Sequence, residues 1–445
     1  MLPRGSSLPS VIRLAGPVGP FHLPSRRTAS VLCGALRNGK IVHAFEDGLR
    51  EILASAEPVG TERVPLARAA GRVLAEPIRA DRDLPPFDRS ERDGWAVRSA
   101  DLIGGMGTLR REETVLFAGY EPRAPLGAGA ALRIMTGAPL PPGADAVVPL
   151  ESSRVARDRV EVAEKDLAPG LHRHARGVDA RAGDLLLAAG TELTPNRLAL
   201  AAAVGAERPS VRRRVRVALL STGDEVVPAA ASPGVAGIRD ANGPAAAAAL
   251  AGLAWVEPAS PRIVPDVEAE LESALGEAIE GADAVVLSGG VSAGDKDLVP
   301  GVLARLGVRE VLHRLAIRPG KPVWFGLARS GALVFGLPGN PMSFQVTFHE
   351  IALVALRKLA GLARVEPEAL RLPLGAPIEK KIAFRQFVPA RLENGDGPTR
   401  ALPVPNHGSG DAVAAARADG VIVLPEGPAA ARPGDFVLFH PWVRS

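Results

Sequence analysis

A glycine-rich turn followed by carboxylates is the first feature of this chain that could do chemistry. The stretch VVLSGGVSAGDKDLVP, residues 285–300, runs from an apolar segment through Gly289 and Gly290 to Asp295 and Asp297. Glycine allows positive φ and close approach of the backbone to a ligand, which suits a phosphate group. Because carboxylates repel phosphate, we interpret the two aspartates as partners of a divalent cation such as Mg²⁺ that bridges carboxylate and phosphate.

Two further segments have similar properties. STGDE at 221–225 contains Glu225, and in GLPGNPMS at 336–343 Asn340 is suited to be an N-cap and Pro341 the first helical residue. Such a helix start leaves free backbone N–H groups that face an anion. The segment HRLAIRPGKP adds three cations that could converge on phosphoryl oxygens, namely Arg314, Arg318 and Lys321.

Each feature also has a simpler interpretation. A glycine-rich turn can be only a tight turn, the three cations can be a solvated surface, and STGDE can be a helix cap followed by acids. The nucleotide fingerprints are missing, since no G-x-G-x-x-G follows a first strand and GGVSAGDK lacks the G-K-[ST] of a P-loop. Only the joint placement of the segments favours a ligand site.

That placement follows from the elements between Arg212 and Gly361. Expected strands alternate with expected helices: VRVALLST, PAAAAALAGLAW, PDVEAELESALGEAIEG, ADAVVLSGG, DLVPGVLARLG, KPVWFG, ALVFGLPG and PMSFQVTFHEIALVALRKLAG. The alternation predicts a mostly parallel sheet covered on both faces. Ligands of such sheets bind beyond the carboxyl ends of the strands, where the three segments lie.

The flanking regions differ in pattern. IVHAFEDGLREILASA has helical apolar spacing, residues 61–178 indicate short strands and turns, and strands such as DGVIVLPEG return from Val365 onward. Residues 1–45 are basic and rich in Ser, Pro and Gly, which indicates a disordered tail. Elsewhere, His172 and His174 form an H-x-H pattern that more often faces solvent than holds a metal.

Composition excludes several classes of function. The 445 residues carry a formal net charge of only +4 with no long basic block, which argues against a nucleic-acid carrier. The single cysteine, Cys33, excludes an internal disulfide and fits a reducing compartment. No apolar stretch reaches membrane length, so we expect a soluble, cytoplasmic protein with no membrane or nucleic-acid partner.

Seven segments together resemble the molybdopterin molybdenumtransferase family, whose eukaryotic relatives include the corresponding domain of gephyrin. They are PPFDRSERDGWAVR, RIMTGAPLPPGADAVV, GVDARAGDLLLAAGT, VRVALLSTGDEV, VVLSGGVSAGDKD, LAIRPGKPVWFG and LPGNPMS, and the likeness runs from about residue 41 to the C-terminus. The resemblance implies an enzyme that takes adenylylated molybdopterin and molybdate, releases AMP and uses a divalent cation, Mg²⁺. It also implies a homodimer with each active site across the subunit interface, and pathway partners that include a molybdopterin adenylyltransferase and molybdoenzyme maturation proteins.

The family fold implies a multidomain α/β plus β architecture. It has an α/β sandwich that binds the pterin, elongated middle β-rich domains and a small C-terminal β-barrel. The implied units are a tail at 1–40, the α/β domain at 41–60 and 210–362, a linking domain at 61–80 and 180–209, the middle domain at 81–179 and the C-terminal domain at 363–445.

Matched position by position, the family implies the following site. The catalytic residues are Asp93, Thr136, Asp179, Glu225, Asp266 and Asp297, of which Glu225 and Asp297 also hold the metal. The substrate-binding residues are Thr222, Gly223, Asp240, Asn242, Ser288, Gly289, Gly290, Ser292, Gly294, Arg314, Arg318, Lys321, Pro338, Gly339, Asn340, Pro341 and Ser343.

The chain departs from the family pattern near several of these positions. It has Arg89, Glu91, Arg92 and Trp95 where the family has Asn, a small residue, Met and Tyr; Val178 replaces a Glu, and Arg314 and Arg318 replace lysines. These changes leave open a diverged paralogue that binds molybdopterin as a carrier or scaffold without insertion activity. A nucleotide hydrolase on a similar α/β domain is a third alternative, but it would not need the middle domain.

Overall fold

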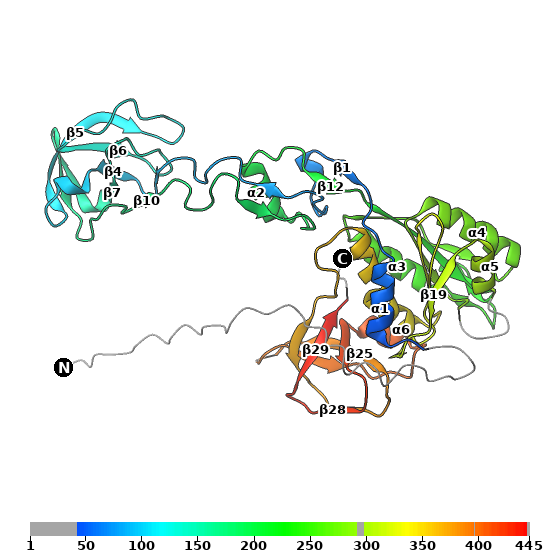
Figure 1. Cartoon of the computed structure of the whole chain (residues 1–445). Coiled ribbons are helices and arrows are strands. Elements are labelled where there is room, and N and C mark those ends of the chain that lie inside the picture. Colours follow the sequence, from blue (N-terminus) through cyan, green and yellow to red (C-terminus); the bar gives the residue numbers. More distant parts are fainter. Residues whose placement is uncertain (1–41, 292–297, 396, 443–445) are drawn as a thin grey trace, which may run out of the picture.

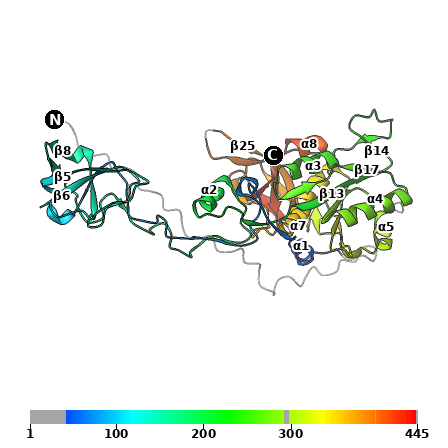
Figure 2. The same ribbon diagram turned by 90° about the horizontal axis from the view of Figure 1, so that it is seen from above.

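The protein is an elongated chain of several packed units. The structure, a computed structural model, describes residues 42–291, 298–395 and 397–442. The tail predicted at 1–40, and Ser292, Gly294, Asp295 and Asp297, lie outside the described residues. A middle β unit lies at one end of the molecule, and the α/β unit with the C-terminal β unit lies at the other (Figures 1 and 2). No helix in the described ranges is long and apolar enough to cross a membrane.

The central sheet is mostly parallel, as the sequence predicts. Its strand order is β16-β13-β18-β22-β21-β19, with β17 also beside β13, and only β21 and β19 are antiparallel to their neighbours. The strands are β13 (Val215–Thr222), β16 (Val256–Pro258), β17 (Arg262–Val264), β18 (Ala284–Ser288), β19 (Arg309–His313), β21 (Trp324–Leu327) and β22 (Leu333–Leu337).

Helices cover both faces of this sheet because its buried strands are apolar on both sides. In β18, Val286 packs with one cluster of core residues, whereas Val285 and Leu287 pack with the other. The first cluster includes residues of α1 (Phe45–Ala54), α3 (Asn242–Ala251), α6 (Pro341–Thr347) and α7 (Leu353–Leu359), and the second includes residues of α4 (Glu268–Gly281) and α5 (Val299–Arg305).

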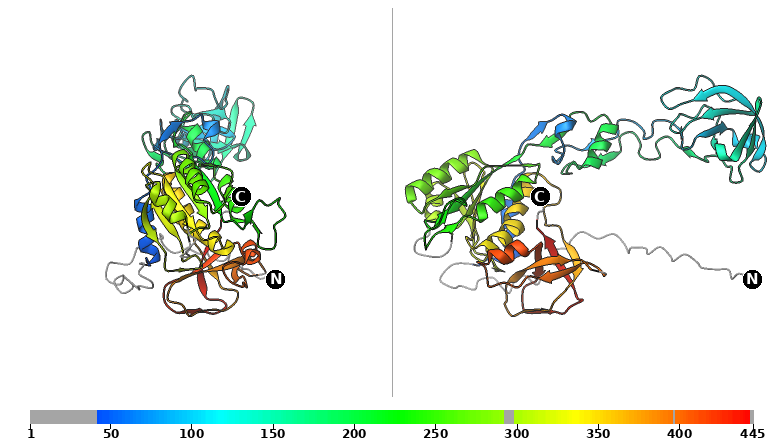
Figure 3. Two further views of the ribbon diagram at one scale, coloured as in Figure 1. Left: turned by 90° about the vertical axis from the view of Figure 1, so that its right-hand side faces the viewer. Right: turned by 180° about the vertical axis from the view of Figure 1, so that it is seen from behind.

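The helix predicted for PMSFQVTFHEIALVALRKLAG contains a π-helical turn. The turn spans Phe348–Ala352 and joins α6 to α7. Its residues are all buried, including Glu350, whose Oε2 lies 2.9 Å from His440 Nδ1 in the C-terminal unit. This helix therefore packs between the sheet and the C-terminal unit (Figure 3).

The C-terminal unit is a small β-barrel, as predicted. Its main sheet has the order β20-β25-β27-β29-β23, and β26 also pairs with β25. A bridge between Leu374, next to β23, and Ala401 in β26 closes the sheet. The elements are β20 (Ile317–Arg318), β23 (Leu370–Pro373), β24 (Ile378–Lys380), β25 (Arg385–Glu393), β26 (Arg400–Pro403), α8 (Ala412–Arg417), β27 (Gly420–Leu424), β28 (Ala429–Ala431) and β29 (Phe436–Pro441).

Two further units precede the α/β unit. A linking unit contains β1 (Thr61–Arg63), β2 (Ile78–Arg79), β11 (Leu185–Leu187), α2 (Pro195–Ala203) and β12 (Ser210–Arg212), and the pairing of β1 with β12 attaches residues 210–212 to it. The middle sheet has the order β7-β4-β6-β5-β9-β8. Its strands are β4 (Gly94–Val97), β5 (Met106–Leu116), β6 (Ala130–Ile134), β7 (Ala146–Pro149), β8 (Ser153–Ala156) and β9 (Arg159–Ala163), with β3 (Arg89–Ser90) and β10 (Arg173–His174) forming a separate pair. The exact domain boundaries stay a prediction.

Candidate functional site

The ends of three neighbouring parallel strands form the core of the candidate site. β13, β18 and β22 lie side by side and end at Thr222, Ser288 and Leu337. The Asn242 amide nitrogen, at the start of α3, donates to Ser288 Oγ at 2.7 Å and to the Gly339 carbonyl at 2.8 Å. The structure thus brings together Ser288 and Gly339, which belong to the predicted strand-end segments, and Asn242, which was named from the family resemblance. Thr222 lies beside them, next to the glycine turn.

The turn after β18 is built for close backbone approach. Gly289 and Gly290 have φ values of +95° and +67°. A Cβ added at Gly289 would lie 2.7 Å from the carbonyl oxygen of Thr222, and one added at Gly290 would lie 2.8 Å from Thr222 Oγ1. Because neither residue can carry a side chain without displacing its neighbours, the glycines keep the backbone at this edge open to a ligand.

Two buried hydroxyls at the end of β13 have no partner within the described part of the chain. They are Ser221 Oγ and Thr222 Oγ1, on residues that are 2% and 4% exposed. Buried polar groups are normally hydrogen-bonded, and each exception calls for a physical explanation. Hydroxyls beside a glycine-rich turn can donate to phosphate oxygens, so a bound phosphate would satisfy them.

Carboxylates surround the loop after β13. Asp224 and Glu225 are exposed, and a Cβ added at Gly223 would lie 2.7 Å from the Glu225 carboxylate, so that side chain folds back over the loop. Asp224 Oδ1 accepts a hydrogen bond from the Asp266 backbone N–H at 3.0 Å. Asp240 Oδ1 accepts one from the Gly243 N–H at 3.1 Å. The loop is followed by a short strand, β14 (Val226–Val227), so the interpretation of STGDE as a helix cap is wrong.

These carboxylates could hold a divalent cation only together with the phosphate groups of a bound substrate. Among the residues with described positions, no group of three or more His, Cys, Asp or Glu side chains could hold a metal ion. Mg²⁺ is usually held by one or two carboxylates together with substrate phosphates, and the exposed Glu225 could supply one such carboxylate. The second predicted ligand, Asp297, lies outside the described residues.

A cavity of about 400 Å³ opens between the α/β unit and the C-terminal barrel. Five of the predicted substrate-binding residues line it, namely Arg318, Lys321, Pro338, Asn340 and Ser343. The barrel adds four polar or small residues that sequence reasoning missed: Gln386, Asn406, Gly408 and Ser409. The loop NHGSG, residues 406–410, has the small polar composition of a ligand loop, but nothing in the sequence places it opposite α6.

The start of α6 differs in one respect from the prediction. Asn340 is the N-cap residue and Pro341 the first helical residue, but the Asn340 side chain makes no capping bond. Instead its Nδ2 donates to Ser409 Oγ at 3.0 Å, and the Met342 N–H donates to the Ser409 carbonyl oxygen at 3.0 Å. The Met342 N–H is therefore not free for an anion, because the barrel loop occupies it.

Two of the three predicted cations face this cavity. Arg318 is exposed and Lys321 is half-buried, with its Nζ 5.6 Å from the centre of the Phe384 ring. Neither forms an ion pair with a described residue, so both charges are available to an anion. Arg314 is not among the residues that line this cavity, so its convergence with the other two cations stays a prediction. Its φ of +80° and its backbone bonds to Val323 and His43 place it at the other end of the segment.

The middle unit carries a separate acidic pair. Asp93 Oδ1 accepts hydrogen bonds from the Thr136 hydroxyl at 2.6 Å and from the Thr136 N–H at 2.7 Å. These two bonds, the hydroxyl first, lower the pKa of Asp93 below its ordinary value. The ionised carboxylate of Asp93 is therefore held in one orientation on the exposed surface.

The Asp179 carboxylate contacts His174, the second histidine of the H-x-H pattern. His174 Nε2 lies 3.1 Å from both Asp179 carboxylate oxygens, and His174 Nδ1 lies 3.2 Å from Glu91 Oε1. The H-x-H pattern predicts a pair that more often faces solvent than holds a metal, and in the structure His174 contacts two carboxylates. No local pattern indicates the contact with Glu91, because Glu91 lies 83 residues earlier in the chain and approaches His174 only in the tertiary structure.

The residues that depart from the family pattern occupy different environments. Trp95 is buried in the core of the middle unit, where its Nε1 donates to Ser153 Oγ at 3.1 Å. Arg89, Arg92 and Val178 are exposed. Trp95 therefore contributes to core packing, whereas Arg89, Arg92 and Val178 belong to the surface of the middle unit.

One chain does not bring the two groups of predicted catalytic residues together. Asp93, Thr136 and Asp179 lie in the middle unit, which stands away from the central sheet with the linking unit between them (Figure 1). Among the described residues, every side-chain hydrogen bond to these three residues comes from within the middle unit. Glu225 and Asp266 lie at the opposite end of the molecule, at the edge of the sheet.

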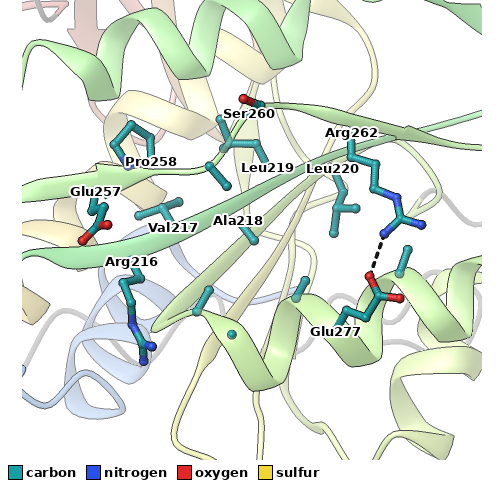
Figure 4. Close-up of a pocket in the computed structure, with 15 residues that line it drawn as sticks. Arg216, Val217, Ala218, Leu219, Leu220, Glu257, Pro258, Ser260, Arg262 and Glu277 are labelled. Carbon is teal, nitrogen blue, oxygen red and sulfur yellow. Dashed lines mark hydrogen bonds and ion pairs between the residues drawn. The ribbon is translucent and has the colours of Figure 1, made fainter.

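A second cavity of about 400 Å³ lies beside β13 and α4 and contains no predicted site residue. Its lining includes Arg262 and Glu277, which form a hydrogen bond of 2.9 Å across it (Figure 4). Val217, Leu219 and Leu220 of β13 are also among the residues that line it. The strand-end site and the cavity beside the barrel are therefore the better candidates.

Comparison with known proteins gives one consistent family. Profiles match for the MoeA N-terminal region (domain I and II) at residues 43–205, a probable molybdopterin binding domain at 218–358 and the MoeA C-terminal region (domain IV) at 371–442. A molybdopterin molybdenumtransferase of Nostoc sp. is 34% identical over 385 residues, which cover 85% of this chain and 88% of the relative. The Haemophilus influenzae protein of the same name is 36% identical over 304 residues, 68% of this chain and 74% of the relative.

Solved structures agree with this result. The crystal structure of the molybdopterin biosynthesis MoeA protein from Pyrococcus horikosii superposes with a TM-score of 0.74 at 32% identity, covering 90% of this chain and 99% of that one. The likeness extends over all the units described above. The chain belongs to the molybdopterin molybdenumtransferase family.

Proposed function

We propose that this protein is a Mg²⁺-dependent molybdopterin molybdenumtransferase, which inserts molybdenum from molybdate into adenylylated molybdopterin and releases AMP. One observation carries the proposal: an open glycine turn beside two buried hydroxyls accompanies a cavity lined by Arg318 and Lys321. Neither the hydroxyls nor the two cations have a hydrogen-bond or ion-pair partner among the described side chains. The names of the related proteins support the same reaction.

The glycine turn and its hydroxyls are assigned to the phosphate of the adenylate. The backbone at Gly289 and Gly290 can approach the phosphate, and Ser221 and Thr222 can donate hydrogen bonds to it. Glu225, with Asp297, would hold Mg²⁺ next to that phosphate, where the ion would polarise the phosphoanhydride that breaks. The positions of these residues favour binding and orientation of the substrate at the strand ends of the central sheet. No residue is assigned as a covalent nucleophile.

The cavity beside the barrel is assigned to oxyanion binding. Arg318 and Lys321 supply positive charge, and Ser343, Asn406 and Ser409 supply hydrogen-bond donors. A tetrahedral oxyanion such as molybdate has the charge and size for this place, and the same cations can stabilise negative charge on the leaving phosphate. Arg318 replaces a lysine of the family, but a guanidinium keeps the charge and binds oxyanions in a fork.

The active protein is proposed to be a homodimer in which a second protomer completes each site. Asp93, Thr136 and Asp179 cannot reach the strand ends of their own chain in the extended arrangement of Figure 1. The ionised Asp93 and the oriented Asp179 would then act on the adenylate bound by the partner. The domain boundaries, the cytoplasmic location, and transfer from an adenylyltransferase to maturation proteins are parts of the same proposal.

A carrier that binds molybdopterin without insertion is the second candidate. It is favoured by one observation, the change of character at Arg89, Glu91 and Arg92 directly before Asp93. The two candidates differ in whether bound substrate releases AMP.

The test is molybdate-dependent AMP release by the purified full-length protein, supplied with adenylylated molybdopterin and Mg²⁺. Glu225→Gln should lower the rate by about 100-fold or more, because a preorganised charge next to the reacting phosphate is lost. Glu257→Gln is the matched control, since Glu257 is an exposed carboxylate on β16 of the same sheet. Tight binding of substrate without AMP release would reject the enzyme and support the carrier.

A further inference from the structure

In the middle unit, His174 lies between two carboxylates. The proposed reaction assigns no role to this histidine. His174 Nδ1 lies 3.2 Å from Glu91 Oε1, and its Nε2 lies 3.1 Å from each oxygen of Asp179. The imidazole is partly buried, with 27% of its side chain exposed, whereas both carboxylates are about half exposed. The ring is therefore the fixed centre of this cluster, and the carboxylates extend from it toward solvent.

Backbone pairing holds the two partners of His174 on separate segments. In the β3–β10 pair, His174 lies opposite Arg89, and the Glu91 N–H donates to the His172 carbonyl oxygen at 3.0 Å. Glu91 is two residues before Asp93, and Asp179 is five residues after His174. The imidazole consequently joins the segment that carries Asp93 to the segment that carries Asp179.

Among the residues that the structure describes, Glu91 and Asp179 form ion pairs with His174 and with no other side chain. Arg173 pairs with Asp88 at 3.4 Å and Arg176 pairs with Asp83 at 2.7 Å, so these two arginines are already engaged. Arg89 is the remaining cation that acts on His174, and it opposes protonation of the ring. Among the described residues, the charged groups that act on the imidazole are thus Asp179, Glu91 and Arg89, while Arg173, Arg176, Asp83 and Asp88 pair with one another.

Both ring nitrogens face carboxylate oxygens, which only accept hydrogen bonds. A neutral imidazole has one N–H and can satisfy one carboxylate, whereas the imidazolium donates from both nitrogens. The contacts with Asp179 and then Glu91 raise the pKa of His174 above its ordinary value of 6.5. The protonated ring is therefore the form that holds both segments together.

We propose that His174 is a positioning residue, whose imidazolium is anchored by Glu91 and orients the Asp179 carboxylate relative to Asp93. The inference rests on the proposed function for its use in catalysis, because it assumes that Asp179 acts on substrate. The proposal also gives Glu91 an indirect part in orienting Asp179, because Glu91 anchors His174. The family pattern has a small residue at position 91. Loss of the proton above the raised pKa releases one carboxylate, so the proposal also gives the reaction an alkaline limit.

The first test needs no substrate. Histidine resonances of the isotope-labelled full-length protein are titrated by NMR, and His174 is assigned by its disappearance in His174→Gln. We expect His174 to titrate above pH 6.5, and both Glu91→Gln and Asp179→Asn to shift its pKa down. A His174 that titrates like an isolated histidine and ignores both substitutions would overturn the proposal, whatever the reaction of the protein is.

The second test uses AMP release. His174→Gln should lower kcat by about 10- to 100-fold with little change in KM, because a misplaced catalytic group costs rate and leaves substrate binding intact. His174→Arg keeps two donors with a permanent charge, so it should restore much of the rate and remove the alkaline limit. His172→Asn is the control, since the φ of +51° at this position suits Asn.

These results separate the two hypotheses. Wild-type kcat and an unchanged pH profile in His174→Gln would reject the positioning role while leaving the transferase intact. If the wild-type protein released no AMP, the proposed function would fail, and the NMR titration would still decide whether His174 clamps the two carboxylates.

Discussion

The side-chain nitrogen of Asn242 donates to Ser288 Oγ at 2.7 Å and to the Gly339 carbonyl oxygen at 2.8 Å. One amide thereby joins the start of α3 to the ends of two parallel strands, β18 and β22. Since Asn242 is only 6% exposed, its bonds are shielded from water. This contact fixes the relative position of the loops that form the candidate phosphate site.

Replacement of this amide should therefore loosen the site. Asn242→Asp removes both donors and places a carboxylate against a carbonyl oxygen, so we expect a loss of about 1–3 kcal/mol in the free energy of unfolding. Thermal denaturation and the KM for adenylylated molybdopterin would measure the effect. Asn196→Asp, at an exposed position in α2, is the control and should change neither. Equal behaviour of the two variants would contradict the role of Asn242.

The glycine turn makes a second prediction. Gly290 has a φ of +67°, and a Cβ there would lie 2.6 Å from Val299 Cγ2 and 2.8 Å from Thr222 Oγ1. Gly290→Ala should abolish measurable substrate binding in calorimetry and destabilise the fold by about 1–3 kcal/mol through overpacking. Gly331→Ala is a matched control, because Gly331 has a φ of +89° but open space around the added atom. If both variants bound substrate normally, the absence of a side chain at Gly290 would not be needed for substrate binding, contrary to this prediction.

The two cations of the cavity beside the barrel should act on the anion. Arg318→Ala and Lys321→Ala should each raise the KM for molybdate by about 10- to 100-fold, the cost of one charge-assisted hydrogen bond. Arg329→Ala removes an exposed arginine away from the cavity and should leave this KM unchanged. The assignment of the cavity to an oxyanion would not survive a molybdate KM that stays constant in both cavity variants.

The Asp93–Thr136 pair predicts a pH effect. The bonds from Thr136 lower the pKa of Asp93, so their contribution to stability is present above the unfolded-state pKa of 3.8 and is lost as pH falls through the lowered value. Thr136→Val keeps the N–H bond but removes the hydroxyl, so the pKa of Asp93 should rise toward 3.8. NMR titration of the Asp93 carboxyl carbon would measure it, with Thr114→Val on exposed β5 as the control. A pKa that does not move would show that the hydroxyl bond is not formed.

The α/β unit could be predicted from the sequence because the patterns that indicate its strands and helices are local. β18 is a continuous apolar run, α4 has charges on one side of its pattern, and the chemistry of Glu225 and Gly289 follows directly after strands. The same logic placed Asn340 at the start of a helix. It could not foresee that Asn340 bonds Ser409, because that loop reaches α6 only through the packing of the barrel.

The middle unit was less predictable for a related reason. Asp93, Thr136 and Asp179 were named from family resemblance, since their surroundings form only when β3 pairs with β10. The contact of His174 with Glu91 depends on that pairing, and no local pattern distinguishes such a histidine from one in solvent.

We propose that one active site combines the middle unit of one protomer with the strand ends of another. The most direct measurement mixes two inactive variants, Asp93→Asn and Glu225→Gln, after the subunits have been allowed to exchange, and follows molybdate-dependent AMP release. If sites are shared between protomers, mixed dimers contain one intact site, and an equal mixture should recover about one quarter of wild-type activity. If mixed dimers form and the mixture stays as inactive as either variant, each site is built within a single chain and the account is wrong.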